Sequence, residues 1–267
     1  MFAFPVILIC FLVTGIDAWG RVEVFADRFE DDIIDVNKWN VADAKTATLT
    51  SGGPVNAQQV LIQNDATQVW EKEHKMFLLT NPPVMFNATP PHLFLTARVD
   101  TRSKFSYQYG EVEWSVQMPL GRGVSASLSL IPDDCKNDPC DHQIDLLYRG
   151  DFPNRVTFMV RSSYQYSSTS DTQHDGIDIT LSNSLATNFN KFRILWDDQQ
   201  VKLYVNFQDN QPENFAIIDN PSLLPHVPMH IRMDTSVGGW YAGLPNTQSS
   251  REASFLIIEE VTVHRWQ

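Results

Sequence analysis

Residues 141–150 read DHQIDLLYRG, a short apolar stretch in which polar residues recur at every second position and then after one extra residue. Successive side chains of a β-strand point to opposite faces, so Gln143 and Asp145 share a face and Tyr148 falls on the other. A one-residue bulge after Asp145 would return Tyr148 to the first face, and bulges often re-aim a side chain in this way. The spacing therefore predicts a bulged strand that presents all three side chains together.

The segments around this strand also have the pattern of β-structure. In residues 111–118 apolar and polar side chains alternate, which gives the segment one apolar and one polar face. Residues 192–196 and 201–206 are two further alternating runs around DDQQ, the pattern of a β-hairpin. No long apolar segment keeps the helical period of about 3.6 residues. The chain is therefore expected to be all-β.

Four blocks of the chain occur in an order that resembles glycoside hydrolase family 16, the laminarinase and β-glucanase family. They are residues 94–113 (FLTARVDTRSKFSYQYGEVE), 143–148 (QIDLLY), 192–206 and 229–243 (MHIRMDTSVGGWYAG). The resemblance implies a concanavalin A-like β-jelly roll, a sandwich of two antiparallel sheets with a cleft across its concave face. It extends over residues 19–267, which are expected to form a single domain.

In that family the strand motif reads E-I-D-I-x-E, and its two glutamates are the nucleophile and the general acid/base. The matching positions here hold Gln143, Asp145 and Tyr148. A retaining glycosidase needs two carboxyl groups, whereas Gln cannot ionise and the phenol of Tyr has a pKa of about 10. We therefore expect no enzymatic activity. The three side chains could instead bind sugar hydroxyl groups, or they could be hydrogen-bonded residues without a ligand.

Aromatic side chains are the other candidates for a sugar site, because their faces stack on pyranose rings. Two tryptophans that the family carries before its active-site strand are replaced here by Ser125 and Ser129. Trp240 and Tyr241 are the remaining candidates for stacking, although either could equally belong to the core.

A catalytic metal or other cofactor is not expected, because the seven histidines are scattered without the spacing of metal ligands. Many members of the resembled family hold a structural calcium between the start of the chain and an Asp on the final strand. Glu259 occupies that position here, so structural calcium stays an open alternative.

An apolar run in residues 4–14 is too short to span a bilayer and is typical of a signal peptide that ends at Ala18. The alternative is a buried N-terminal strand. With the signal removed, Cys135 and Cys140 remain and are expected to form a disulfide in an oxidising compartment. Two free thiols or half of a metal site are the alternatives. Asn87 begins the one acceptable glycosylation sequon. These features predict a secreted glycoprotein.

The formal net charge of −12 argues against nucleic acid or an anionic membrane as partner. The sequence thus predicts a secreted, non-catalytic protein that binds a β-1,3-glucan-like polysaccharide, similar to the animal β-1,3-glucan recognition proteins of innate immunity. One alternative is an extracellular structural or coat protein that uses the sandwich as a scaffold for protein partners. Another is a glycosidase with relocated catalytic residues.

Overall fold

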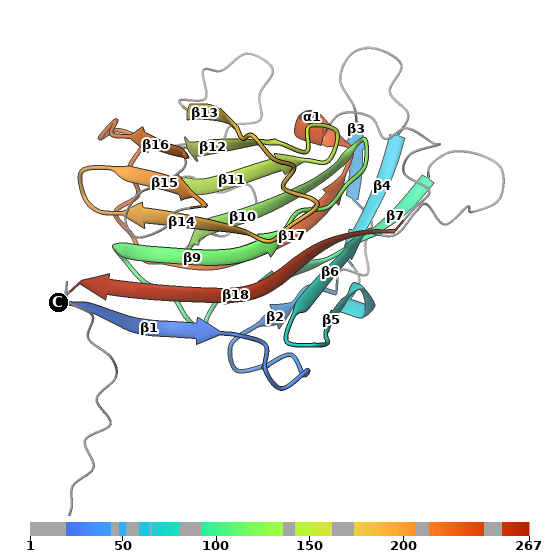
Figure 1. Cartoon of the computed structure of the whole chain (residues 1–267), viewed down its shortest axis with the longest axis horizontal. Helices are drawn as coiled ribbons and strands as arrows, with labels where there is room; N and C mark the ends of the chain where they lie inside the picture. Colours follow the sequence, from blue (N-terminus) through green and yellow to red (C-terminus); the bar gives the residue numbers. More distant parts are fainter. Residues whose placement is uncertain are drawn as a thin grey trace, which may run out of the picture.

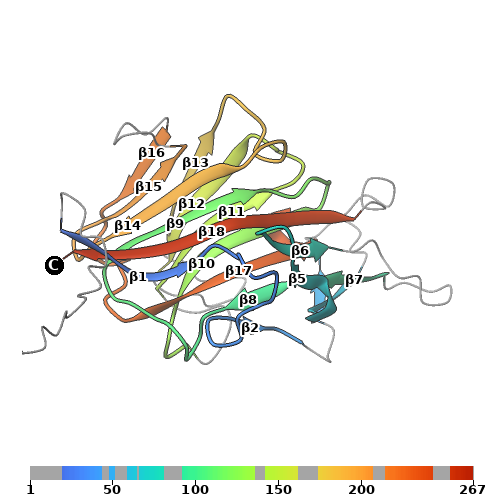
Figure 2. The same cartoon turned by 60° about the horizontal axis from the view of Figure 1, so that its bottom comes forward.

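The computed structural model describes residues 20–43, 48–51, 59–64, 66–80, 92–135, 142–161, 174–206, 214–242 and 253–266. Within this part of the chain two large antiparallel sheets lie face to face, as Figures 1 and 2 show from two directions. The prediction of an all-β sandwich of the jelly-roll type is confirmed.

The first sheet has eight strands, and seven of them follow one another across the sheet. Their order is β16 (Asn214–Ile218), β15 (Val201–Val205), β14 (Asn190–Trp196), β9 (Gly110–Gln117), β18 (Ser254–Trp266), β6 (Met76–Thr80) and β5 (Val69–Glu71). The eighth strand, β1 (Arg21–Asp27), also pairs with β18. The expected hairpin is β14–β15, where the Asp197 carboxylate accepts hydrogen bonds from the amides of Gln199 and Gln200.

The second sheet has seven strands, and the stretch quoted at the start lies inside it. The order is β13 (His174–Thr180), β12 (Arg155–Arg161), β11 (Gln143–Arg149), β10 (Val124–Pro132), β17 (Met229–Val237), β8 (Arg98–Asp100) and β2 (Asn40–Val41). A small third sheet joins β3 (Thr48–Ser51), β4 (Gln59–Asn64) and β7 (His92–Thr96). Short helices are η1 (Ala66–Gln68) and α1 (Gly239–Ala242). No helix in the described ranges is long and apolar enough to cross a membrane.

The core lies between the two large sheets and follows from the alternation of the strands. On β9 the side chains of Val112, Trp114 and Val116 are buried, and Ile144 and Leu146 of β11 belong to the same hydrophobic cluster. Burying each large apolar side chain contributes about 1.5–3 kcal/mol, so this interface supplies most of the driving force for folding.

The prediction of a bulge in β11 is wrong. Residues 143–148 pair one for one with Arg161–Val156 of β12, and residues 144–149 pair without a shift with β10. A bulge would have to break hydrogen bonds to both neighbours, because β11 lies in the middle of the sheet. Strict alternation therefore places Leu147 on the face of Gln143 and Asp145, and Tyr148 on the core face.

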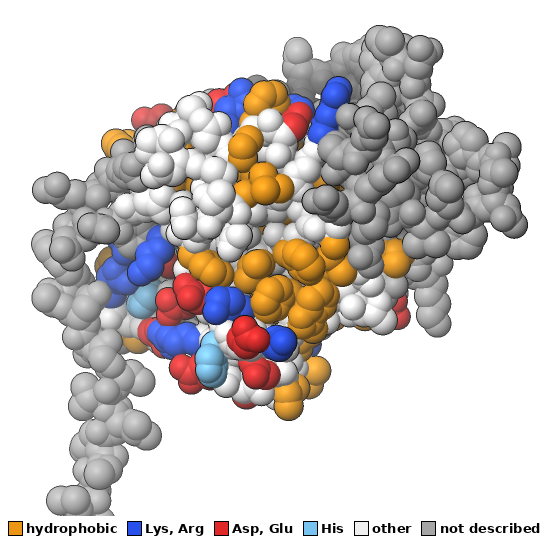
Figure 3. Space-filling view, turned by 45° about the vertical axis from the view of Figure 1, so that its right-hand side comes forward, with side chains coloured by type: hydrophobic (Ala, Val, Ile, Leu, Met, Phe, Trp, Pro, Cys, Tyr) orange, Lys and Arg blue, Asp and Glu red, His pale blue; other side chains and the backbone are white. Residues whose placement is uncertain are grey.

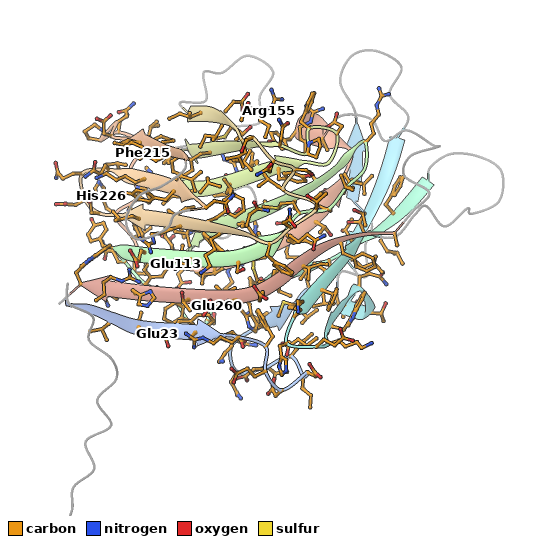
Figure 4. The ribbon with its side chains drawn as sticks, in the orientation of Figure 1. Glu23, Glu113, Arg155, Phe215, His226 and Glu260 are labelled. Carbon is orange, nitrogen blue, oxygen red and sulfur yellow. The ribbon has the colours of Figure 1, made fainter. Side chains whose placement is uncertain are left out.

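The outward face of the eight-stranded sheet has an aromatic end and an end with charged side chains of both signs. Trp70 of β5 stacks on Phe77 of β6 with 5.6 Å between ring centroids, and Phe255 of β18 meets both rings edge-on. Figure 3 shows a patch of hydrophobic side chains beside a region of mixed charge. Figure 4 labels Glu113, Glu260 and Glu23 on the neighbouring strands β9, β18 and β1.

Cys135 is disulfide-bonded, as expected for one member of the predicted pair. Its expected partner Cys140, the sequon residue Asn87 and the proposed signal segment 1–18 lie outside the described residues. Those parts of the sequence analysis stay predictions.

Candidate functional site

The face of the seven-stranded sheet that points away from the core carries a set of polar side chains, and we call it the polar face. Because strands β10, β11, β12 and β17 are in register, side chains far apart in sequence become neighbours. Ser129 pairs with both Asp145 and Arg232, and Gln143 pairs with Arg161. Gln143 and Asp145 thus lie together on this face, which the alternation of the strand predicted.

Asp145 is held from several sides. Its Oδ1 accepts hydrogen bonds from Ser129 Oγ (2.7 Å) and Gln143 Nε2 (2.6 Å). Its Oδ2 accepts from Arg161 Nε (3.0 Å) and from Arg161 Nη2. Only 1% of Asp145 is exposed, so this is a buried ion pair, and the extra donors compensate for the loss of water around the carboxylate.

Gln143 has one half of its amide unused. Its Nε2 donates to Asp145, whereas its Oε1 is buried and has no hydrogen-bond partner among the described residues. A buried acceptor without a donor costs about 1–3 kcal/mol, so such an atom calls for an explanation. A ligand hydroxyl or a bound water would satisfy it.

Tyr148 does not belong to this site, which corrects its assignment as a ligand-binding residue. Its side chain is fully buried in the core between the sheets, where it pairs with Ala126 and Val156 on the neighbouring strands. Burial raises the pKa of its phenol well above the usual value. Leu147 takes the expected place of Tyr148 on the polar face.

Tyr241 of α1 does lie over the polar face, but its hydroxyl is already engaged. The hydroxyl oxygen is 3.0 Å from the carbonyl oxygen of Leu147, to which it donates, and 3.0 Å from Thr157 Oγ1. The pKa of Tyr241 is raised, mainly by burial. Tyr241 therefore fastens α1 to β11 and β12. The side chain of Trp240 lies outside the described residues.

The sequence analysis missed several charged neighbours of this site. Asp234 of β17 lies 3.5 Å from Arg232 Nε and 3.9 Å from Arg98 Nε, so two arginines flank one carboxylate. Arg161 was also missed. In the sequence, Arg161 is simply an arginine on the polar side of an alternating strand. That pattern does not reveal which residue it pairs with.

The spacing of carboxyl groups on the polar face bears on hydrolysis. On β10, Ser129 pairs with Asp145 of β11 and Ser127 pairs with Asp234 of β17. Asp145 and Asp234 are therefore two strands apart across the sheet and two residues apart along the strands. With strands about 4.8 Å apart and a rise of about 3.4 Å per residue, their backbones lie about 12 Å apart. Paired catalytic carboxyl groups lie about 5–5.5 Å apart in retaining enzymes and about 6.5–9.5 Å apart in inverting enzymes. Asp145 and Asp234 are thus not placed as a retaining pair.

A cluster on the outward face of the other sheet has the spacing of metal ligands. Ligand atoms of Glu111, Glu113 and His264 lie within 4.8 Å of one another. However, Arg21 Nη2 lies 2.8 Å from Glu111, and Arg193 Nη2 lies 2.6 Å from Glu113. Burial raises the pKa of Glu111 to about 7. Two guanidinium groups already balance these carboxylates, so the cluster is better described as an ion-pair network.

The proposed calcium position can be located as well. Glu259 lies on β18 and its Oε2 accepts a hydrogen bond from Ser115 Oγ at 2.9 Å. This contact neither supplies nor requires a cation, and structural calcium at Glu259 stays an open alternative to the expectation of no cofactor.

The chain belongs to glycosyl hydrolases family 16, because residues 56–255 match the sequence profile of that family. It is 22% identical over 267 aligned positions to glucan endo-1,3-beta-glucosidase A1 of Niallia circulans. This alignment covers 93% of this chain and 38% of that protein. It is 25% identical over 184 positions to a beta-glucanase of Rhodothermus marinus. This alignment covers 65% of this chain and 63% of that protein. The chain thus spans less than two thirds of either relative.

A solved structure has the same fold. The laminarinase catalytic domain of Thermotoga maritima MSB8 superposes with a TM-score of 0.72 at 17% identity, over 92% of this chain and 99% of that one. At this identity the likeness concerns the fold.

The prediction that the chain is not an enzyme is contradicted by these comparisons, since both sequence relatives bear the names of glucan-cleaving enzymes. The prediction rested on Gln143 and Tyr148, which stand where the family motif carries its two glutamates. The regular register of β11 places Tyr148 in the core, so Gln143 alone of these two lies on the polar face.

Proposed function

We propose that this chain acts on a β-1,3-glucan-like polysaccharide, which it holds against the polar face of the seven-stranded sheet. The observation that carries the proposal is the buried Gln143 Oε1, an acceptor without a donor beside the fixed Asp145 carboxylate. A sugar ring presents hydroxyl donors at close spacing, and one of them would complete the hydrogen bonding of Gln143. Membership in family 16 supports a polysaccharide as the ligand.

Asp145 has a defined part in this proposal. Ser129, Gln143 and Arg161 fix its orientation before any ligand arrives, so no rearrangement of the carboxylate is needed on binding. Cleavage of the glucan is the activity to measure, because the sequence relatives are named for it. Asp145 is the carboxyl group of β11 that such chemistry would use.

The test is laminarin binding by calorimetry, together with release of reducing ends, for the full secreted chain and two variants. Gln143→Met removes, at similar size, both the acceptor and the donor to Asp145, and it is expected to weaken binding at least about tenfold, the equivalent of one hydrogen bond in a buried site. Glu23→Gln, on the outward side of β1, is the matched control and should bind like the parent chain. Folded protein that neither binds nor cleaves laminarin or lichenan would contradict the proposal.

We also propose that the chain is secreted after removal of residues 1–18. The apolar run in residues 4–14 and the disulfide-bonded Cys135 support this proposal. Expression in a eukaryotic secretory host should give a mature protein that begins at Trp19 and loses mass with a glycosidase that removes N-linked glycans. A protein in the medium that still carries residues 1–18 would count against a signal peptide. A mass unchanged by the glycosidase would count against glycosylation of Asn87.

A further inference from the structure

The turn between β11 and β12 carries two arginines on one exposed aromatic ring, and we call Arg149, Phe152 and Arg155 the turn cluster. The guanidinium carbon of Arg149 lies 4.8 Å from the Phe152 ring centroid, and that of Arg155 lies 4.4 Å from it. Phe152 is 41% exposed. Stacked guanidinium groups of this kind keep their hydrogen-bond donors around the edge, available to a ligand.

The turn cluster belongs to the same face as the proposed glucan site. Alternation along β11 places Arg149 with Gln143 and Asp145, and alternation along β12 places Arg155 with Arg161. Arg149 is four residues from Asp145, a distance of about 13 Å along the strand. Figure 4 labels Arg155 near α1, whose Tyr241 ring lies 6.0 Å from the Arg149 guanidinium. A polysaccharide on the polar face can therefore reach the turn cluster.

The backbone under the cluster is closely packed. A Cβ on Gly150 would lie 2.5 Å from the carbonyl oxygen of Gly121, so the turn is in direct contact with the loop between β9 and β10. Gly150 also donates a backbone hydrogen bond to Val124, and Phe152 donates one to Arg149. The cluster is thus ordered before a ligand binds, which lowers the entropy cost of binding.

The two arginines differ in how they are paired. Arg149 donates to both carboxylate oxygens of Asp151, at 3.0 and 2.8 Å. Arg155 Nη1 is 3.6 Å from Asp178 Oδ2, too far for a hydrogen bond, and Thr157 already donates to Asp178 Oδ1. Within the described residues the Arg155 guanidinium makes this ion pair and the stacking contact, but no hydrogen bond. Exposed ion pairs contribute only about 0–1 kcal/mol, so a ligand anion could replace Asp178.

We propose that the turn cluster is a subsite for an acidic group on the polysaccharide, a carboxylate or a sulfate, bound by Arg155 with Arg149 beside it, while the Phe152 ring supports both guanidinium groups. The inference rests on the proposed function and deepens it, because the ligand becomes an acid-bearing glycan. Either acid presents two oxygens that match the fork of a guanidinium group. The net charge of −12 repels anions from the molecule as a whole, so such binding requires a local basic site.

The experiment compares the affinity of the full chain for neutral, carboxymethylated and sulfated laminarin by calorimetry. We expect at least one acidic form to bind about tenfold more tightly than the neutral form, the gain typical of a charge-assisted hydrogen bond. That preference should disappear in Arg155→Gln and in 1 M NaCl, where the Debye length is about 3 Å. The carboxymethylated and sulfated arms show which acid is preferred.

Two further variants separate the site from a general charge effect. Phe152→Leu keeps an apolar side chain but loses the aromatic support of Arg155, so it should reduce the preference for the acidic forms. Arg28→Gln removes an exposed arginine of the other sheet, which pairs with Glu23 and Glu260, and should leave the preference unchanged.

The outcomes distinguish this inference from the proposed function. Tight binding of neutral laminarin without any preference for the acidic forms, or a preference that survives in Arg155→Gln, overturns the subsite and leaves the glucan proposal standing. Binding of acidic forms alone, lost in Arg155→Gln, supports the subsite and overturns the neutral glucan as ligand. No binding of any form by folded protein overturns both.

Discussion

Asp145 and Arg161 form a buried ion pair. Neither charge would be stable in the interior without the other. Arg161 donates to Asp145 Oδ2 from both Nε and Nη2, and the two residues are 8% and 1% exposed. Removing one partner of such a pair leaves the other charge buried, which commonly costs about 3–5 kcal/mol. The pair therefore links the polar face to the stability of the whole sheet.

Arg161→Met is expected to lower the free energy of unfolding by about 3–5 kcal/mol, because Asp145 would keep its charge without a counter-ion. Urea unfolding followed by tryptophan fluorescence measures the change. Arg28→Met is the matched control, because Arg28 is an exposed arginine whose ion pairs should contribute no more than about 1 kcal/mol. Equal losses in both variants would show that the buried pair has no special role.

At the scale of the element, the register of β11 decides the role of Tyr148. In the part of the chain that the structure describes, the buried Tyr148 hydroxyl has no hydrogen-bond partner, so no hydrogen bond offsets its loss of hydration. Tyr148→Phe should leave the unfolding free energy unchanged or raise it by up to about 1 kcal/mol. Laminarin binding should also be unchanged, in contrast to Gln143→Met. Weakened binding in folded Tyr148→Phe would mean that Tyr148 reaches the polar face after all.

The turn between β11 and β12 packs so closely on the loop between β9 and β10 that only a glycine fits at position 150. A Cβ on Gly150 would meet both the backbone nitrogen and oxygen of Gly121 at less than 3.0 Å. Because backbone atoms cannot yield as side chains do, Gly150→Ala should destabilise the protein by about 1–3 kcal/mol, the usual cost of overpacking.

Gly176→Ala on β13 provides the comparison for this prediction. Its Cβ would meet the Met159 side chain at 3.6 Å, an ordinary contact, so thermal unfolding should change far less than in Gly150→Ala. Similar melting temperatures for the two variants would contradict the close approach of the two turns.

At the scale of the whole molecule, buried carboxyl groups should make stability depend on pH, and Glu71 is one of them beside Glu111. Glu71 of β5 has two buried carboxylate oxygens that accept no hydrogen bond from any residue in the described ranges. Burial, with further contributions from Asp27 and Asp31, raises its pKa from 4.5 to about 7. Between these values the folded state holds a proton that the unfolded state has lost, so the contribution of Glu71 to stability falls as pH rises.

Glu71→Gln should remove the contribution of Glu71 to this dependence, because the amide does not titrate, while that of Glu111 stays. The variant should gain stability relative to the parent chain as the pH rises from about 4.5 to about 7, as measured by urea unfolding across that range. Glu73→Gln, two residues away and exposed, should keep the dependence of the parent chain. A parallel stability profile for Glu71→Gln and the parent would contradict the shifted pKa.

Much of the architecture could be predicted from local pattern. The alternation in residues 111–118 and the hairpin around DDQQ correspond to β9 and to β14–β15, because the two-residue period of a strand is a property of neighbouring residues. The same period placed Gln143 and Asp145 on one face. The expected bulge failed because a bulge depends on both neighbouring strands, which sequence pattern does not reveal.

The sequence by itself determined the all-β class, the strand that carries the site and the shared face of Gln143 and Asp145, since each depends on short-range alternation. Only the tertiary structure decided that Tyr148 is a core residue, that Arg161 holds Asp145 from sixteen residues away, and that two arginines share the ring of Phe152. The physical reason is register. A shift of one residue between strands exchanges the two faces of a strand, and register is fixed by packing across the whole sheet.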